Sequence, residues 1–494
     1  MDIKIRAAKN IAGMNFQINN IKTETLKMLQ YCDDTTLILS NQADLEEALR
    51  IIDSFFCLSG LKLNKEKSIA MWIGSSKDNT NQPCNLLWKK KGELIKILGV
   101  FFSAIKEASD IEENWVNKIK QINEIACRLL RRKTTIWGKV LLCKTFMISQ
   151  ISYLLQSLAL PEKVLNEIDS ICFKFIWNKN SKNKRIIEKI KRSVMCIEKD
   201  QGGASMIKSA SQQKLFLAKW IMKIGKTEQS KVFKLTKLPD IYFNFYGNHD
   251  IFTKFLCKQT DLEYPSYISR FWRDAINSWL VLKHNFKIIH EAEPEVIKDY
   301  CNIQHDKIPI FFNKDLTYKN KIIFFPRWIK AGIHTLDQIT NENGNILLTT
   351  NIDDSIKKRP DFMFDFGVVN TAFTNHKRNN SNFSMLELNV NKILRAKNSL
   401  LRYIIDYSLP RELCGKQFWE RKYTNTDIKG KYLSSIKSIK ETKLQVTLFK
   451  IFHNILPSGV LRKKMKLTES DKCVCGETDF IEHRLVHCQL LQPL

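Results

Sequence analysis

Two adjacent carboxylates, Asp33 and Asp34, follow Tyr31 and Cys32 and precede the apolar run at residues 37–39. β-Branched residues on the way to that run predict strand, tight turn and strand, with the acidic pair at the turn. Carboxylates at the rim of a sheet can hold Mg²⁺ or Mn²⁺, because these cations prefer oxygen ligands, and two such ions serve phosphoryl transfer. An Asp-Asp pair taken alone is more often a solvated turn, so its surroundings decide.

A second group of potential ligands lies near the C-terminus and consists of Cys473, Cys475, His483 and Cys488. Three thiolates and an imidazole suit a tetrahedral Zn²⁺ site. One residue separates the first two cysteines, where two or three are usual, and His487 is an alternative to His483 as the imidazole ligand. The spacing predicts a zinc knuckle, against the alternative of ordinary cysteines near a terminus.

The segments after the acidic pair predict further regular structure. From Asp44, apolar residues recur at helical spacing up to Gly60, which is expected to end the helix. Two short apolar segments, 68–73 and 95–101, predict strands. Residues 1–107 are therefore predicted to form part of an α/β sheet domain.

The order of these segments resembles the reverse transcriptases of LINE-type (non-LTR) retrotransposons. Their catalytic hairpin carries Tyr-Xaa-Asp-Asp, matched by residues 31–34, and a helix leads into Gly-Leu-Xaa-Leu-Asn-Xaa-Xaa-Lys-Ser, matched by residues 60–68. Leu98 and Gly99 resemble the Leu-Gly core of the primer-grip hairpin that comes next. The C-terminal Cys/His group resembles the knuckle with which such polymerases commonly end.

The resemblance implies a role for individual residues. Asp33 would be a Mg²⁺ ligand and Asp34 its catalytic neighbour, while Tyr31 and Lys67 would lie near the incoming nucleotide. Cys32 stands where the family usually has Ala, and the position stays small. The implied activity is RNA-directed DNA polymerisation on an RNA or DNA template-primer, with Mg²⁺ or Mn²⁺ at the palm and Zn²⁺ at the knuckle.

One part of such an active site has no counterpart in the sequence. A reverse transcriptase palm takes another metal-binding aspartate from a strand many tens of residues before the hairpin, and 30 residues precede Tyr31. We therefore expect an N-terminally truncated enzyme with an incomplete metal cage, which does not polymerise alone. The alternative is a non-catalytic nucleic-acid-binding remnant of a mobile element.

The charge balance favours a polyanionic partner. Lys and Arg outnumber Asp and Glu by 79 to 51, a net charge of +28, which raises the concentration of nucleic acid near the surface. A codon bias toward lysine is the alternative source of this excess.

Two basic segments are candidates for phosphate contacts. One lies at the junction of two predicted helices, and the other belongs to the densest basic stretch, 178–193. A solvated helix face and a nuclear-import signal are the alternatives for that stretch. The candidate residues are Arg131, Arg132, Lys133, Lys182, Lys184 and Arg185.

Together these patterns predict an α+β, multidomain chain. The expected parts are a partial reverse transcriptase palm at 1–107, thumb-like helices at 108–160, a mainly helical basic region at 161–340, a loop-rich linker at 341–410 and a C-terminal domain with the zinc knuckle at 411–494. Trp272, Trp279 and Trp328 lie near other apolar residues, which favours core positions over base stacking.

Cysteine usage and hydropathy indicate the compartment. Most of the 13 cysteines are isolated within apolar surroundings, which favours free thiols in a reducing environment. The start lacks the apolar core of a secretory signal, and no run approaches the ~18 apolar residues of a membrane span. We expect a nuclear or cytoplasmic protein with RNA and DNA as partners and no membrane contact. The sequence gives no indication of the oligomeric state.

Overall fold

In the computed structural model, residues 2–491 are described except for several internal segments. These segments are 19–20, 61, 178–187, 227–267, 305–307, 312, 314–315, 341–359, 380–384, 410–412 and 424–426. The chain forms two compact units, each assembled from separate stretches. The first unit comprises Met1–Asn114 and Lys214–Ile405, and the second comprises Trp115–Gln213 and Asp406–Leu494. This division differs from the five consecutive parts that the sequence predicts.

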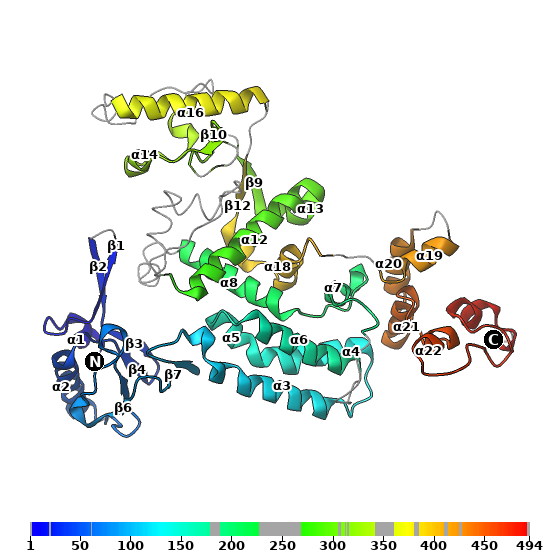
Figure 1. The fold of residues 1–494 in the computed structure, drawn as a ribbon, viewed down its shortest axis with the longest axis horizontal. Helices are drawn as coiled ribbons and strands as arrows, with labels where there is room; N and C mark the ends of the chain where they lie inside the picture. The colour runs from blue at the N-terminus through cyan, green and yellow to red at the C-terminus, as the bar shows by residue number, and fades with distance from the viewer. Residues whose placement is uncertain are drawn as a thin grey trace. The chain divides into compact units, whose positions relative to one another are not determined.

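The N-terminal part of the first unit consists of short strand pairs and two helices (Figure 1). Its elements are α1 (Asp2–Ala7), β1 (Met14–Ile18), β2 (Ile21–Leu26), β3 (Met28–Tyr31), β4 (Asp34–Leu37), α2 (Gln42–Ser59), β5 (Ile69–Met71), β6 (Leu87–Lys89), β7 (Ile95–Ile97) and β8 (Val100–Phe102). The pairs β1–β2, β3–β4 and β7–β8 are antiparallel, and β5–β6 is parallel. Among the described residues each pair is a separate two-stranded sheet, whereas the sequence suggested one α/β sheet.

Helix α2 begins and ends near the residues that the sequence indicates. The Asn41 side chain accepts a hydrogen bond from the Asp44 N–H at 2.9 Å, and Gly60 closes the other end at φ 73°, a conformation that glycine adopts without steric cost. The inner face of α2 packs against α1 and β3. The buried residues of this core are Ile5, Ile11, Met28, Ala48 and Ile52.

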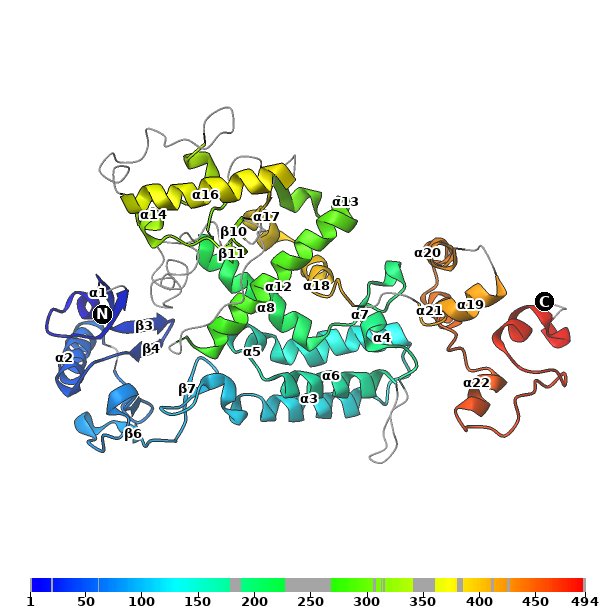
Figure 2. The ribbon, with the colours of Figure 1, turned by 45° about the horizontal axis from the view of Figure 1, so that its top comes forward.

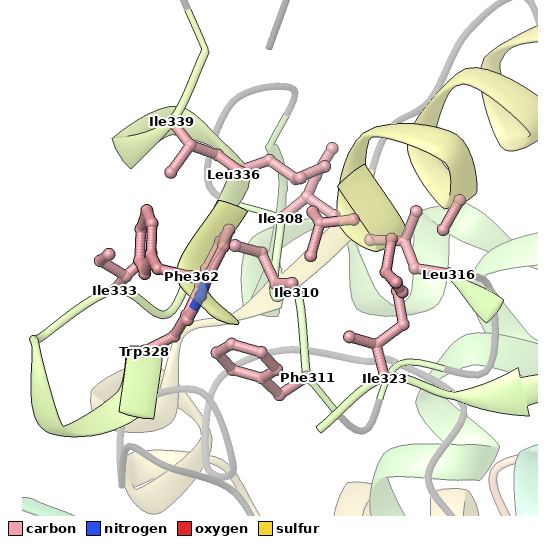
Figure 3. Packing of buried hydrophobic residues seen from close by; sticks show 13 residues of the cluster. Ile308, Ile310, Phe311, Leu316, Ile323, Trp328, Ile333, Leu336, Ile339 and Phe362 are labelled. Carbon is pink, nitrogen blue, oxygen red and sulfur yellow. The ribbon is translucent and has the colours of Figure 1, made fainter. Parts of the chain in front are cut away.

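The remainder of the first unit is mainly helical. Its elements are most of α8 (Ser209–Lys226), α12 (Arg270–Ala292), α13 (Pro294–Ile297), β9 (Cys301–Gln304), β10 (Thr317–Tyr318), β11 (Lys321–Ile322), α14 (Pro326–Lys330), α16 (Pro360–Asn379), β12 (Met385–Leu388), α17 (Val390–Arg395) and α18 (Asn398–Ile405). Trp328 is fully buried and stacks on Phe362 with ring centroids 4.8 Å apart, at the centre of an apolar cluster (Figure 3). Trp279 is also fully buried, so both tryptophans are core residues, and Trp272 is half-buried.

The segment expected to be a loop-rich linker contains regular structure where it is described. Helices α16, α17 and α18 lie in it, and β12 pairs antiparallel with β9. The Asn285 amide of α12 donates to the carbonyls of Ile404 and Ile405 at 2.7 and 3.0 Å, which fixes the end of α18. Because α16 is rich in Asn and Thr, the spacing of its apolar residues did not indicate a helix with buried positions such as Val369.

The second unit is helical. Its elements are α3 (Val116–Leu129), α4 (Ile136–Leu142), α5 (Ser152–Ser157), α6 (Glu162–Ile176), α7 (Arg192–Cys196), α19 (Lys416–Lys422), α20 (Ile428–Ser438), α21 (Thr442–Phe452) and α22 (Gly459–Lys464). Helices α3 and α6 lie side by side in both ribbon views (Figures 1 and 2). Between α4 and α5 the chain continues as a π-turn, Cys143–Met147, and a 3₁₀ turn, Ile148–Ile151, within the stretch where the sequence predicts thumb-like helices.

The C-terminal stretch shares a core with the thumb-like helices. The buried His453 ring lies 2.8 Å from the Gly202 carbonyl oxygen through Nε2, and its Nδ1 accepts from the Cys414 N–H at 3.2 Å. The rings of Trp137 and Phe449 meet edge to face at 5.8 Å. The Trp137 contact joins the predicted thumb-like helices at 108–160 to the predicted domain at 411–494, and the Gly202 contact joins the predicted basic region at 161–340 to that same domain.

Candidate metal centre and acidic hairpin

The acidic pair lies at a β-hairpin, as the sequence predicts. In the register of β3 and β4, Tyr31 pairs with Asp34, which leaves Cys32 and Asp33 as a two-residue turn. Cys32 has a φ of 54°, the left-handed conformation that a turn of this length requires of its first residue. The backbone conformation therefore restricts which residue types fit at position 32, and Asp33 lies at the tip of the hairpin.

Both carboxylates are exposed. Met28 and Leu37 form the paired end of the hairpin that packs toward α2, and the Ile38 N–H donates to the Lys27 carbonyl at 2.8 Å. Tyr31, Asp33 and Asp34 at the other end are open to solvent. In the part of the chain that the structure describes, neither aspartate belongs to a group of three ligand-type side chains. The hairpin thus offers one carboxylate pair to a metal ion.

The other residues assigned to the palm lie in separate turns of the first unit. Lys67 is exposed in the turn before β5, where its backbone N–H donates to the Asn64 side-chain oxygen at 3.1 Å. Leu98 and Gly99 form the two-residue turn between β7 and β8 with φ of 47° and 84°. Two consecutive positive φ values are typical of a type I′ hairpin turn, so the predicted single strand at 95–101 is a hairpin.

Three of the six basic residues that the sequence proposes for phosphate contacts lie among the residues that the structure describes. Arg131, Arg132 and Lys133 are exposed at the junction of α3 and α4, and none of them forms an ion pair with an acid among the described residues. Lys182, Lys184 and Arg185 lie outside the described residues.

The Cys/His group converges in space. The ligand atoms of Cys473, Cys475, His483 and Cys488 all lie within 4.8 Å of one another. The sulfurs of Cys473 and Cys488 are 3.9 Å apart, and Cys475 Sγ lies 3.1 Å from His483 Nε2. Two sulfurs at about 2.3 Å from a tetrahedral zinc would be ~3.8 Å apart, so the four side chains could hold a metal such as zinc. His487 is exposed and lies outside the group, so His483 is the histidine that converges with the three cysteines.

Local backbone geometry brings the four side chains together. The Cys473 N–H donates to the Glu477 carbonyl at 2.8 Å, and Gly476, at φ 91°, donates to the Cys473 carbonyl at 2.9 Å. This tight turn explains how one intervening residue suffices between the two cysteines. A π-turn, His483–His487, then returns the chain so that the Cys488 N–H donates to the His483 carbonyl at 2.7 Å.

Electrostatics favour a thiolate at Cys473. The backbone N–H of Cys475 and the His483 ring lower the pKa of Cys473 to about 7. The Glu477 N–H favours a thiolate at Cys475 too, but burial and the neighbouring thiols outweigh it and raise the pKa of Cys475. A thiolate is the form that binds zinc.

A buried carboxylate that sequence reasoning missed supports the group. The Asp479 carboxylate accepts two hydrogen bonds from the Arg484 guanidinium, each at 2.6 Å, and a third from the Gly459 N–H at 2.6 Å. Burial alone would raise the pKa of Asp479, but the Arg484 guanidinium and the Gly459 N–H outweigh it and lower that pKa. Asp479 therefore fixes α22 and the π-turn around the four ligands. Nothing in the sequence around Asp479 distinguished it from the other acidic residues nearby.

Comparison with known proteins gives one partial likeness. No protein-family model matches the chain. Over 155 residues, 30% of this chain, it is 27% identical to an uncharacterised 149 kDa protein of transposon TX1 from Xenopus laevis. The match spans 11% of that protein's length. The likeness supports an origin of this chain in a mobile element.

Among the described helices, none combines the length and apolar character needed to cross a bilayer.

Proposed function

We propose that this chain is part of the reverse transcriptase of a LINE-type retrotransposon and binds an RNA or DNA template-primer. The observation that carries the proposal is the hairpin at Tyr31, Asp33 and Asp34, where adjacent exposed carboxylates stand at a two-residue β-turn. In this proposal residues 1–107 are a partial palm and α3 to α5 are thumb-like. The similarity to a transposon protein supports the same origin.

The proposed chemistry at the hairpin is limited by the carboxylate count. Mg²⁺ or Mn²⁺ at Asp33 would neutralise developing charge on a transferred phosphoryl group. Asp33 and Asp34 would hold such an ion, with Tyr31 beside them and Lys67 near the incoming nucleotide. Because the described residues group no third ligand with this pair, we propose that the chain does not polymerise by itself. The same observation favours the second candidate function, a non-catalytic nucleic-acid-binding remnant.

We propose Zn²⁺ as the occupant of the Cys/His group. The donor set fits, because soft thiolates and imidazole favour zinc over hard cations, and four protein ligands leave no open position for catalysis. The role of the zinc would therefore be structural, holding the last residues of the second unit together.

The proposed template-primer surface includes the thumb-like helices. A groove between α3 and α6 is lined by Lys120, Lys174 and Asn123, which can donate hydrogen bonds to phosphate oxygens. Glu167, Ser170 and the apolar residues Val116, Ile119 and Ile171 complete the lining. The exposed triad Arg131, Arg132 and Lys133 follows α3 directly. Phosphate contacts of this kind give affinity that falls steeply with salt.

Replacing Arg131, Arg132 and Lys133 together by alanine is expected to weaken template-primer binding at least about tenfold at ~0.1 M salt. The slope of log affinity against log salt should fall by about 2 to 3, because each phosphate contact contributes ~0.9. Fluorescence anisotropy of a labelled RNA–DNA hybrid, titrated at several salt concentrations, measures both quantities.

A charge-matched control separates contact from net charge. Lys298, Lys319 and Lys321 are also exposed but lie in the first unit, far along the chain from the thumb-like helices. Their triple alanine variant should keep the wild-type salt slope. Equal losses in both variants would mean that bulk charge accounts for binding, and the proposed surface would be wrong.

A further inference from the structure

The β7–β8 hairpin depends on support from the segment that follows it. Among the described residues the hairpin is a separate two-stranded sheet, and an isolated hairpin is at best marginally stable in water. Residues 103–114 contact β8 through the two turns Ala108–Asp110 and Glu112–Asn114. Ile111, between these turns, is buried, so the supporting segment has an apolar anchor of its own.

One side chain of this segment, Asn114, binds the backbone of β8 directly. The Asn114 Oδ1 accepts from the Phe101 N–H at 2.8 Å, and the Asn114 Nδ2 donates to the Phe101 carbonyl at 3.1 Å. The same Nδ2 donates to the Ala108 carbonyl at 2.9 Å. Asn114 is 5% exposed, so these three hydrogen bonds are shielded from competing water.

The register of the hairpin explains why Asn114 meets both backbone groups of one residue. Ile97 and Val100 flank the two-residue turn, and Lys96 pairs with Phe101. Hydrogen-bonded and non-hydrogen-bonded pairs alternate along antiparallel strands, so the N–H and the carbonyl of Phe101 point to the outer edge of β8. The Asn114 carboxamide therefore covers this edge where a third strand would otherwise pair.

The charges distinguish the hairpin from the segment that supports it. Residues 94–106 carry two lysines and no acid, and Leu98 and Phe102 are 46% and 38% exposed. Residues 107–113 carry four carboxylates and no base. Arg270, the first residue of α12, binds two of them: its backbone N–H donates to Glu107 at 3.2 Å and its guanidinium to Asp110 at 2.8 Å. A phosphate backbone would therefore be attracted to the hairpin and repelled by residues 107–113.

We propose that Asn114 is a positioning residue, which holds the β7–β8 hairpin so that Lys96 and Leu98 contact the sugar–phosphate backbone of a bound template-primer. The inference rests on the proposed function, because it takes the template-primer as the ligand. Asn114 is buried against β8 and acts through the hairpin without touching the nucleic acid.

A double-mutant cycle on the full chain tests this role. Asn114→Ala and Leu98→Ser should each weaken binding of a labelled RNA–DNA hybrid about fivefold. The combined variant should bind no more weakly than the weaker single variant, because a hairpin without its support no longer makes the Leu98 contact. Asn117→Ala, at an exposed asparagine on α3, is the matched control and should leave both the affinity and the effect of Leu98→Ser unchanged.

A second variant, Asn114→Asp, separates the hairpin from the fold as a whole. Its carboxylate can still accept from the Phe101 N–H but can donate to neither carbonyl, so it should also remove the effect of Leu98→Ser. Urea unfolding of the same samples shows whether each variant is folded. Global unfolding of both Asn114 variants would assign this side chain to the fold as a whole, and the positioning role would be wrong.

The contrary results distinguish this inference from the proposed function. A wild-type chain that does not bind the hybrid would overturn both. Binding that Leu98→Ser leaves unchanged would overturn the positioning role alone, because the hairpin would then make no contact. So would effects of Asn114→Ala and Leu98→Ser that multiply in the combined variant, since the two residues would then act independently.

Discussion

Cys488→Ser is expected to abolish zinc binding and to unfold the last part of the second unit. Cys488 is buried, its sulfur lies 3.9 Å from that of Cys473, and serine is a poor ligand for zinc. Loss of one ligand leaves two thiols and an imidazole crowded without a metal. Because structural zinc binding is coupled to folding, residues around the π-turn at His483–His487 should lose their resistance to protease.

Two measurements check this result. Metal analysis of chelator-free protein should find one zinc per wild-type chain and almost none in the variant, and limited proteolysis should cut the variant after α21. Cys127→Ser, at an exposed thiol on α3, is the matched control and should retain both zinc and resistance to protease. Zinc-free wild-type protein, or a Cys488→Ser variant indistinguishable from it, would show that these cysteines are ordinary buried thiols.

The packing of residues 406–494 on residues 115–213 in the second unit is expected to become less stable in mild acid. Burial lowers the pKa of His453 to about 4 from its usual 6.5, although the Gly202 carbonyl acts in the opposite direction. As pH falls, the unfolded chain therefore takes up a proton before the folded chain does. The stabilisation is complete above pH ~6.5 and is lost as pH falls through ~4, by about 2 kcal/mol between pH 7.5 and 5.

Urea unfolding at pH 7.5 and pH 5 measures this loss. His453→Gln is the informative variant, because its amide can still donate toward Gly202 and accept from Cys414 but carries no titratable group. Wild type should lose about 2 kcal/mol more than the variant on acidification. Equal losses would mean that His453 titrates normally and that this packing does not depend on its neutral form.

Local features were predictable from sequence because neighbouring residues determine them. The β-turn at Asp33, the helix from Asp44 to Gly60 and the convergence of the Cys/His ligands all follow from spacing over fewer than twenty residues. The burial of Trp279 follows for the same reason.

Features that depend on distant pairing were not predictable. His453 meets the Gly202 carbonyl across 251 residues, and nothing in either neighbourhood marks the contact. A Cβ on Gly203 would overlap the Ile197 carbonyl, a requirement visible only once the turn is built. The division into two interleaved units arises from such contacts. The role of Asp479 was missed for a related reason, since its partner Gly459 lies 20 residues earlier in the chain, at the start of α22.

Primer extension tests the central claim most directly. The full chain, loaded with zinc and supplied with Mg²⁺ or Mn²⁺, is mixed with an RNA–DNA template-primer and nucleoside triphosphates, and binding and incorporation are measured in the same sample. We expect salt-sensitive binding with no more incorporation than the Asp33→Asn variant shows. Template-directed incorporation that disappears in that variant would contradict an incomplete metal cage, and absence of binding would contradict the proposed origin of this fold in a template-primer-binding polymerase.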